Sequence, residues 1–419
     1  MTQGGDEGSA PRSITEHRDH ILATIRPLAP ATVPLHEALG HTLAADLHAD
    51  VNVPGFDNSA MDGYAVRLAD VTSAAPDTPV TLRVVADLPA GASDDPALST
   101  GEVTRIMTGA PVPTDADCIV PIEDTDEGTV TVTIVRAPTP AAHIRRTGTD
   151  VQAGDLVLPA GRVLGPRDLA AAAATGASGL LVHPAPRIGV ISTGSELRDP
   201  GEPLGRGQIF NSNSVLLAAL VNSSGGIPVQ LGSVPDDEDA LRTMLDRAAP
   251  SIDAFVTSGG VSVGAYDVVK AVLAPMGVWF GPVRMQPGKP QGFGSWPGPG
   301  GAAGPPIFAL PGNPVSVFVS FEAFVRPALL ALQGQHDVLQ ESQSGVATAG
   351  WRSPIGRTQY MPVVARRQAD GTLAVRPASS GGSGSYLVAS LAGANGLAIV
   401  PEAVTEVRIG DAIEVILIP

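Results

Sequence analysis

The chain reads Ala-Phe-Val-Thr-Ser-Gly-Gly-Val-Ser-Val-Gly at residues 254–264, an apolar run that passes directly into a glycine-rich loop. The apolar part predicts a buried strand, and the residues after the loop predict a helix. Glycines at a strand-to-helix turn let the backbone pass close to a ligand and turn its N–H groups toward an anion. A merely tight turn would use the same glycines, so both interpretations stay open at this point.

The surrounding sequence alternates between strand-like and helix-like segments. The predicted strands are Ile188–Ser192, Pro228–Val234, Ala254–Thr257, Val278–Met285 and Ile307–Ala309, and the predicted helices are Ser212–Asn222, Glu238–Ala248, Asp267–Ala274 and Pro314–Leu332. Such alternation indicates a doubly wound α/β domain, in which a parallel sheet carries helices on both faces. Sheets of this kind bind ligands beyond the carboxyl ends of their strands.

Three loops fall at those carboxyl ends. They are Ser192–Glu196, Ser258–Gly264 and Pro311–Ser316. In the third loop Asn313 precedes Pro314, which is the pattern of a helix N-cap with proline at the first helical position, and a plain cap is the alternative to a ligand site. Because all three loops belong to one edge of the predicted sheet, together they favour a site for a phosphorylated ligand.

Charged side chains accompany these loops. Glu196, Asp236 and Asp267 follow successive predicted strands, so they are expected to converge on one crevice. Carboxylates are hard oxygen ligands that suit Mg²⁺, although acidic residues at helix N-termini more often serve the helix dipole or the cap. Lys289, in Pro287–Pro290, would hold a phosphate or an oxyanion as a point charge.

The rest of the chain lacks this regular alternation of strands and helices. Ser13-Ile14-Thr15-Glu16 has the pattern of a capping box and predicts a helix start, and the Gly/Pro-rich stretch Gly294–Pro306 is predicted to be an exposed loop. Short β runs broken by Gly, Pro and Asp predict β structure before residue 148 and again from about 335. The predicted organisation is a disordered tail at 1–12, a discontinuous mixed domain at 13–54 plus 148–185, a β-rich domain at 55–147, the α/β domain at 186–333 and a C-terminal β-barrel-like domain at 334–419.

Two segments of the β-rich domain carry polar groups around turns. The segment 57–65 reads Asp-Asn-Ser-Ala-Met-Asp-Gly-Tyr-Ala and contains the carboxylates of Asp57 and Asp62. The segment 104–111 closes a strand and opens a turn, where the Thr108 hydroxyl and the Gly109 N–H are expected to be available as donors. An ordinary strand end is the alternative interpretation of the second segment.

Composition excludes several classes of protein. The 26 basic residues stand against 42 acidic ones, and no basic stripe with interleaved aromatic residues is present, so a nucleic-acid partner is not expected. No apolar run reaches the ~18 residues of a membrane helix, and the polar start up to Pro11 lacks the apolar core of a signal peptide. The single cysteine, Cys118, allows no internal disulfide and no thiolate cluster. Together these features predict a cytoplasmic protein without a membrane partner.

Six segments taken together resemble molybdopterin molybdenumtransferases of the MoeA type, whose eukaryotic relatives include the E domain of gephyrin. The segments are Asp57–Ala65, Arg105–Pro111, Ile191–Leu197, Ser258–Gly264, Pro287–Pro290 and Pro311–Ser316. The resemblance covers residues 13–419 in the same order. It implies an enzyme that inserts molybdenum from molybdate into adenylylated molybdopterin, releases AMP and depends on Mg²⁺. It also implies a homodimer, with the mixed domain as linker and dimerisation domain.

The resemblance further implies roles for individual residues. In the implied dimer, the active site lies between the α/β domain of one subunit and the β-rich domain of the other, and Asp62 and Thr108 match positions that act across that interface. The implied catalytic positions on the α/β domain are Glu196, Asp236, Asp267 and Lys289, of which the three carboxylates are the implied metal ligands. The residues implied to contact the pterin substrate are Ser258, Gly259, Gly260, Ser262, Gly264, Pro311, Gly312, Asn313 and Ser316, with Arg357 and Ser385 from the C-terminal domain.

The chemistry of these residue types suggests a division of labour. Glu196 and Asp62 are candidates for proton handling, because molybdate must be protonated each time it loses an oxo group. One position departs from the family pattern: relatives often show Lys-Pro-Gly-Lys-Pro, whereas here Gln286 replaces the first lysine. The missing cation would weaken molybdate binding, shift the metal preference, or mark a sub-branch, and these interpretations stay open.

Three other functions stay open. The α/β domain alone resembles the adenylyltransferase that prepares the substrate, but the additional β domains argue against that enzyme. A pterin carrier that delivers cofactor to apo-molybdoenzymes would not need Asp62, Thr108 and Glu196. Tungstate is nearly equal to molybdate in size and charge, so the sequence does not separate the two. The adenylyltransferase and the apo-molybdoenzymes are also the expected protein partners of an insertase.

Overall fold

The computed structural model describes residues 10–235, 237–261, 267–298, 303–379 and 384–418. The chain divides into two compact units. The first unit comprises Met1–Ala31, Gly40–Ala44 and Val182–Pro419, and the second comprises Thr32–Leu39 and Ala45–Leu181. The predicted residues Asp236, Ser262 and Gly264 lie outside the described part of the chain.

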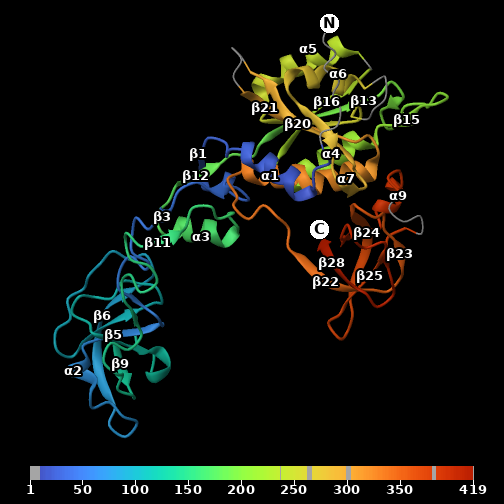
Figure 1. Cartoon of the computed structure of the whole chain (residues 1–419). Helices are drawn as coiled ribbons and strands as arrows, with labels where there is room; N and C mark the ends of the chain where they lie inside the picture. The colour runs from blue at the N-terminus through green and yellow to red at the C-terminus, as the bar shows by residue number, and fades with distance from the viewer. Residues whose placement is uncertain (1–9, 236, 262–266, 299–302, 380–383, 419) are drawn as a thin grey trace. The chain divides into compact units, whose positions relative to one another are not determined.

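A six-stranded sheet forms the centre of the first unit, in the order β16-β13-β17-β21-β20-β18 (Figure 1). The strands are β13 Arg187–Thr193, β16 Ile227–Val234, β17 Ala254–Ser258, β18 Trp279–Pro282, β20 Pro290–Pro297 and β21 Ala303–Leu310. The pairs β13–β16, β13–β17 and β17–β21 are parallel, whereas β20 and β18 continue the sheet in antiparallel fashion. The carboxyl ends of four parallel strands therefore share one edge of the sheet.

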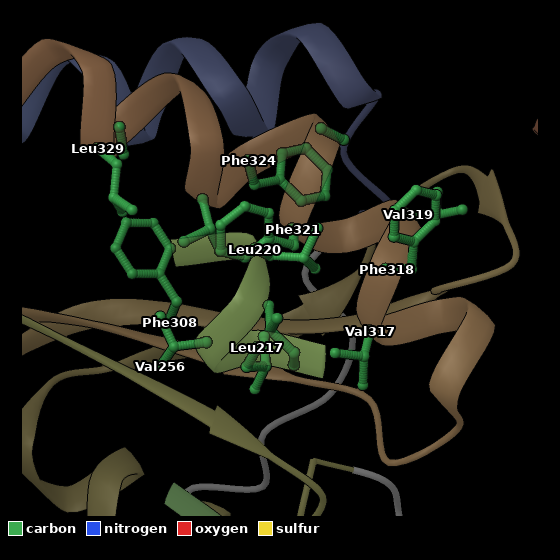
Figure 2. Packing of buried hydrophobic residues seen from close by; sticks show 14 of the residues in the cluster. Leu217, Leu220, Val256, Phe308, Val317, Phe318, Val319, Phe321, Phe324 and Leu329 are labelled. Carbon is green, nitrogen blue, oxygen red and sulfur yellow. The ribbon is translucent and has the colours of Figure 1, made fainter. Parts of the chain in front are cut away.

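Helices cover both faces of this sheet because successive strand residues point to opposite sides. Val256 packs into the larger core cluster with α4 and the helical segment after β21, whereas Phe255 packs into a second cluster with α5 and α6. Figure 2 shows the first cluster, in which Leu217 of α4 lies near Val256 and Phe308. The helices are α1 Ile14–Thr24, α4 Ser212–Ser223, α5 Glu238–Ala248, α6 Val268–Leu273, α7 Pro314–Ser320 and α8 Arg326–Leu332.

Helix α1 starts at the predicted capping box. The Ser13 hydroxyl accepts a hydrogen bond from the Glu16 N–H at 3.1 Å, and the Glu16 carboxylate accepts one from the Ser13 N–H at 2.6 Å. The helix after β21 continues from α7 through a π-helical turn at Phe321–Val325 into α8. This stretch, 314–332, is long and apolar enough to cross a membrane, but 83 % of its most apolar window is buried in the protein, so core packing accounts for its composition.

The end of the first unit is a closed barrel. Its strands follow the order β24-β25-β22-β28-β26, and an additional β24–β26 pairing closes the ring. Bulky apolar side chains such as Met361, Val363 and Val375 fill the inside. The elements are β22 Ser342–Ala347, β23 Trp351–Arg352, β24 Thr358–Arg367, β25 Leu373–Pro377, α9 Val388–Leu391, β26 Gly396–Val400, β27 Glu406–Val407 and β28 Ala412–Leu417. Strand β19, Met285–Gln286, joins the barrel by parallel pairing with β24.

The second unit contains a five-stranded sheet in the order β8-β5-β7-β6-β9. Gly63 on β5 is required for close strand approach, since a Cβ there would overlap the Val120 carbonyl on β8. The main elements are β5 Gly63–Val66, α2 Leu68–Val71, β6 Val80–Leu88, β7 Glu102–Ile106, β8 Cys118–Pro121, β9 Thr131–Ile134 and α3 Pro166–Ala174. The smaller strands are β1 Ala31–Pro34, β3 Leu47–His48, β4 Asn58–Ser59, β10 Ile144–Arg145, β11 Leu156–Leu158 and β12 Gly179–His183. The last two residues of β12, Val182 and His183, belong to the first unit and pair there with β2, Thr42–Leu43.

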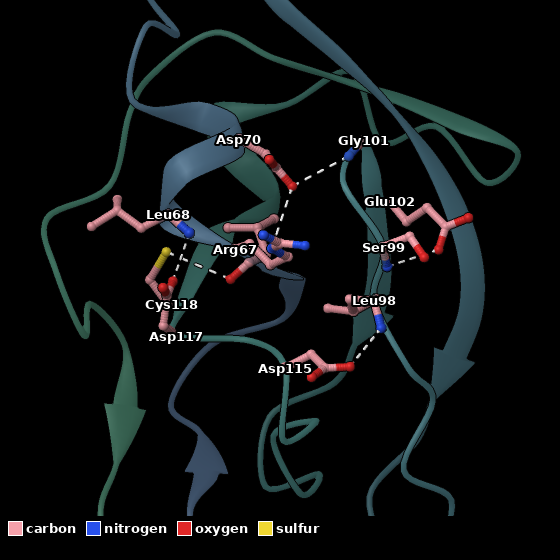
Figure 3. A network of polar contacts seen from close by, with 11 residues as sticks. Arg67, Leu68, Asp70, Leu98, Ser99, Gly101, Glu102, Asp115, Asp117 and Cys118 are labelled. Atoms are coloured by element: carbon pink, nitrogen blue, oxygen red, sulfur yellow. Dashed lines mark hydrogen bonds and ion pairs between the residues drawn. The ribbon is translucent and has the colours of Figure 1, made fainter.

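A network of carboxylates fixes the loops of this second unit (Figure 3). Asp117 accepts a hydrogen bond from the Leu68 N–H at 2.6 Å, and Asp115 accepts one from the Leu98 N–H at 3.0 Å. The neighbouring Cys118 thiol donates to the Val66 carbonyl, and burial, reinforced by Asp117, raises the pKa of Cys118 to about 12. A thiol with so high a pKa stays protonated and unreactive at neutral pH.

The predicted fold class is confirmed: a doubly wound α/β domain, a β-rich part and a C-terminal β barrel are all present. Two detailed predictions are wrong. The segment Val278–Met285 is not one strand, because the ladder of β18 ends at Pro282, which has no N–H to donate, and β19 belongs to the barrel. The predicted loop Gly294–Pro306 contributes to the antiparallel pair β20–β21. Gly294 serves packing, since a Cβ there would lie 2.8 Å from the Cα of Val278.

Candidate functional site

A pocket of about 770 Å³ opens at the carboxyl ends of the parallel strands of the first unit. It is lined by the residues after β13, β17 and β21 and by the start of α4. Of the predicted site residues, the pocket walls include Glu196, Ser258, Gly259, Gly260, Asp267, Pro311, Gly312, Asn313 and Ser316. The three loops that the sequence placed at one sheet edge therefore surround one cavity.

The loop after β17 is built so that only glycine fits. Gly259 has φ +96° and Gly260 has φ +68°, a left-handed backbone that side chains disfavour. A Cβ on Gly259 would lie 2.8 Å from the Thr193 carbonyl oxygen, and one on Gly260 would lie 2.6 Å from Val269. The loop is anchored by hydrogen bonds from the Gly259 N–H to the Leu310 carbonyl and from the Lys270 N–H to the Gly260 carbonyl, both 3.1 Å. The two glycines thus let the loop pack directly against Thr193 and Val269.

The loop after β21 leads directly into α7. Asn313 occupies the N-cap position and Pro314 the first helical position, as the sequence predicted, but the Asn313 side chain makes no capping hydrogen bond. The Gly312 carbonyl instead accepts a hydrogen bond from the Asn213 side chain at 2.7 Å. Gly312 also passes close to the other glycine loop, because a Cβ there would lie 3.5 Å from the Gly259 Cα. The two loops are therefore packed backbone against backbone.

Two carboxylates line the pocket. Glu196 follows β13, and its carboxylate folds back over Gly194, where a Cβ would meet it at 2.5 Å. Asp267 occupies the N-cap position of α6. Within the described ranges no three His, Cys, Asp or Glu side chains cluster closely enough to hold a metal ion by themselves. Two carboxylates nevertheless fit Mg²⁺, which commonly uses one or two carboxylates together with substrate phosphates.

The segment with Lys289 lies beside the pocket. Its neighbour Pro290 lines the cavity, whereas Lys289 is exposed and is not among the lining residues. The turn is fixed from inside by Gln291, whose buried amide donates to the Gly288 carbonyl and to the Ser320 hydroxyl, each at 2.7 Å. A rigid turn thus carries an exposed lysine at the pocket edge.

The two predicted residues of the barrel part lie outside the pocket lining. Arg357 donates a hydrogen bond at 3.3 Å to the side-chain oxygen of Gln286, the residue that departs from the expected family pattern. The Ser385 carbonyl accepts a hydrogen bond at 3.0 Å from the Val315 N–H in the first turn of α7. The segment around Ser385 is therefore attached to the pocket, although Ser385 itself does not line it.

Asp62 and Thr108 lie in the second unit and form a pair. One oxygen of Asp62 accepts hydrogen bonds from the Thr108 N–H at 2.7 Å and from the Thr108 hydroxyl at 2.8 Å. These bonds, the backbone one first, hold the pKa of Asp62 below its usual range. The expectation that the Thr108 hydroxyl and the Gly109 N–H are available donors is wrong, because the Gly109 N–H donates to the Ser59 carbonyl at 2.8 Å. The turn uses both donors to close itself.

Several lining residues were not predicted. They come from the start of α4 and from two short apolar segments: Ile209, Phe210, Asn211, Ser212, Asn213, Tyr386 and Val388. The side-chain oxygen of Asn213 is buried and has no hydrogen-bond partner among the residues that the structure describes, so it is a ready acceptor for a ligand. The start of α4 has a sequence signal in the run Asn-Ser-Asn-Ser at 211–214, a polar stretch typical of a helix N-cap.

Comparisons with known proteins place the whole chain among relatives of one kind. Three family models match it: the MoeA N-terminal region (domain I and II) at residues 12–176, the probable molybdopterin binding domain at 189–331 and the MoeA C-terminal region (domain IV) at 344–418. The chain is 46 % identical to "Molybdopterin molybdenumtransferase 2" of Mycobacterium tuberculosis, over 96 % of this chain and 99 % of that protein. It is 34 % identical to "Molybdopterin molybdenumtransferase 1" of the same organism, over 96 % and 98 %.

Solved structures agree with the sequence comparison. A crystal structure of the molybdopterin biosynthesis moeA protein from Pyrococcus horikoshii matches with a TM-score of 0.77 at 28 % identity, covering 97 % of this chain and all of that one. The whole architecture, and not only the α/β domain with its pocket, is therefore similar to that protein.

Proposed function

This chain belongs to the MoeA family of molybdopterin molybdenumtransferases, and from that membership we propose how its pocket inserts molybdenum. The substrates are adenylylated molybdopterin and molybdate, and the products are the molybdenum cofactor and AMP. The observation that carries the proposal is the meeting of two glycine loops, two carboxylates and an amide in one pocket at the carboxyl edge of a parallel sheet.

The glycine loops bind the phosphates of the substrate. Phosphate groups need donors that approach without side chains in the way, and the loops at Gly260 and Gly312 place backbone in the pocket wall, whereas the Gly259 N–H already donates to the Leu310 carbonyl. Lys289, exposed at the pocket edge, offsets phosphate or molybdate charge. Asn213 adds an acceptor for a donor group of the substrate. Local groups of this kind are needed because the chain as a whole carries a formal charge of −16.

Glu196 and Asp267 would hold Mg²⁺ together with substrate oxygens, and the family resemblance implies the same role for Asp236. Bound there, Mg²⁺ would supply positive charge that offsets the phosphates of the substrate. Glu196 and Asp62 handle protons, because the oxo groups that leave molybdate must be protonated to depart as water. The two hydrogen bonds from Thr108 keep Asp62 in the base form, so it would take a proton from a substrate thiol and pass that proton to the departing oxo group.

We further propose that the enzyme is a homodimer in which Asp62 and Thr108 of one subunit complete the pocket of the other. Support comes from the family resemblance and from the division of the site residues: the pocket is lined by residues of the first unit, whereas Asp62 and Thr108 belong to the second. The adenylyltransferase that makes the substrate and the apo-molybdoenzymes that receive the product are the proposed transient partners, and the proposed location is the cytoplasm.

Mixing of inactive subunits tests the shared site. Asp62→Ala and Asp267→Ala are each expected to abolish molybdate-dependent AMP release while leaving the fold intact. Heterodimers formed from the two variants contain one pocket with both carboxylates, so they are expected to regain up to about half of the activity of a wild-type dimer. Activity in either single variant would contradict the assigned roles, and a mixture without recovery despite exchanged subunits would contradict the shared site.

A further inference from the structure

The pocket has an apolar rim that the phosphate-binding loops do not explain. Ile209 is 55 % exposed, Phe210 44 %, Tyr386 72 % and Val388 38 %, and all four line the pocket. The chain is poor in aromatic residues, at 4 %. Among the described residues the large exposed aromatic side chains are Phe56, Phe210 and Tyr386. Two of these three therefore line one cavity.

The structure holds the backbone of Tyr386 firmly while leaving its ring in solvent. The preceding Ser385 carbonyl accepts the hydrogen bond from Val315 at the start of α7, and the Tyr386 carbonyl itself accepts one from the Val388 N–H at 2.9 Å. The next side chain, Leu387, packs against the larger core cluster. Because the anchoring is done by its neighbours, the Tyr386 ring has no packing role that accounts for its presence.

Phe210 is held in a comparable way from a different part of the chain. It ends the short strand β15, Ile209–Phe210, which pairs in parallel with β14, Leu197–Arg198. The following Asn211 is 2 % exposed, donates its N–H to the Arg198 carbonyl at 2.8 Å and caps α4 by accepting from the Ser214 N–H at 3.1 Å. Both aromatic side chains thus project from fixed backbone, which lowers the entropy cost of binding a flat partner.

We propose that Tyr386, with Phe210, is the surface on which a flat heteroaromatic ring of the substrate stacks. This inference rests on the proposed function, because adenylylated molybdopterin carries two such rings, adenine and pterin, joined through phosphates. The glycine loops provide for the phosphates and leave the rings without a partner. Aromatic side chains bind flat heterocycles by stacking, and each stacked base contributes enough that its loss weakens binding roughly 5- to 150-fold. Tyr386 is therefore a specificity residue for the ring.

The test compares ring binding in Tyr386→Ala, Tyr386→Phe and the wild-type protein. The probes for calorimetry are AMP, ribose 5-phosphate and pterin-6-carboxylate, so that the adenine and the pterin contributions are read separately. Tyr386→Ala is expected to weaken binding of AMP or of the pterin about tenfold and to leave ribose 5-phosphate unchanged. Tyr386→Phe keeps the ring face and is expected to bind like the wild type. Ile409→Ala is the matched control, because Ile409 is 74 % exposed and lies outside the pocket lining.

The same variants are then assayed for molybdate-dependent AMP release. In Tyr386→Ala the KM for adenylylated molybdopterin is expected to rise about tenfold while kcat at saturation changes little, since the ring is remote from the bond that breaks. Unchanged affinity for both AMP and the pterin in Tyr386→Ala would overturn the inference, whether or not the wild type turns over. A wild-type protein that binds AMP through Tyr386 but releases none in the presence of molybdate would overturn the proposed function and leave the ring surface standing.

Discussion

Replacing Gly260 by alanine separates two physical costs in the loop that floors the pocket. The residue has φ +68°, and a left-handed backbone costs a side-chain-bearing residue about 1–2 kcal/mol. A Cβ would also lie 2.6 Å from the Val269 side chain and 3.1 Å from its backbone nitrogen. Val269 is fully buried, so it has little room to move, and overpacking of this kind costs roughly 1–3 kcal/mol. The expected sum is about 2–5 kcal/mol.

Two other glycines provide matched controls. Gly277 has φ +89°, and nothing lies within 4 Å of the place that a Cβ would take, so Gly277→Ala carries the backbone cost alone. Gly312 lines the same pocket without a positive φ, and its added Cβ would make an ordinary contact at 3.5 Å, so Gly312→Ala is expected to leave the melting temperature nearly unchanged. A rise in KM in Gly312→Ala would report interference of the added methyl group with the substrate. The difference between Gly260→Ala and Gly277→Ala therefore measures the overlap with Val269.

Calorimetric unfolding and the KM for adenylylated molybdopterin are measured together. The chain has two compact units, so the shift of each unfolding transition is reported and not one global free energy. Each kcal/mol lowers the melting temperature of a domain of this size class by about 2–4 °C. If the loop moves to relieve the overlap, the cost appears as a higher KM instead. A Gly260→Ala protein that matches Gly277→Ala in both melting temperature and KM would contradict an overlap with Val269.

Three further predictions concern groups outside that loop. Burial lowers the pKa of His17 to about 3, so below about pH 6.5 the unfolded chain binds a proton that the folded protein does not. The free energy of unfolding should therefore fall by about 1.4 kcal/mol for each pH unit below pH 6.5, until the folded pKa is reached. Thermal unfolding of His17→Gln between pH 7 and pH 4 should show a correspondingly shallower pH dependence. Hydrogen bonds from Thr108 lower the pKa of Asp62 in the folded protein, so the ionised carboxylate stabilises the fold above the unfolded pKa of about 4. This stabilisation is lost as the pH falls through the lower folded pKa. The difference in melting temperature between the wild type and Asp62→Asn should therefore disappear in that pH range. Gln286→Lys places a second cation beside Arg357, so the KM for molybdate should fall and should become more sensitive to salt, whereas an unchanged KM would mean that this position does not face the oxyanion.

The sequence predicted the α/β core well because its signals are local and long. Helix α5, Glu238–Ala248, was predicted with its observed bounds, since a proline precedes it, acidic residues fill its first turn and its apolar face is periodic. The Gly294–Pro306 error has the opposite cause. Glycine there makes room for a neighbouring strand, and that requirement is visible only once β18 and β20 are paired.

Some residues of the candidate site could be predicted from the sequence and others could not. The glycine loops and the pocket carboxylates follow strands of one sheet, so their convergence could be foreseen from topology. The aromatic rim could not, because Tyr386 reaches the pocket from a segment more than a hundred residues beyond the strand that precedes Gly259, through a backbone hydrogen bond to α7. Nor could the use of the Thr108 hydroxyl, which depends on how a turn folds back onto Asp62.

The most direct test of the account is the ratio of molybdenum gained by the pterin to AMP released. The purified protein is given adenylylated molybdopterin, Mg²⁺ and molybdate, and the molybdenum in the product pterin and the free AMP are measured in the same sample. We expect equal amounts of the two, with AMP release dependent on molybdate and lost in Asp267→Ala. AMP release that proceeds without molybdate, or without molybdenum appearing in the pterin, would contradict the assignment of insertion to this pocket.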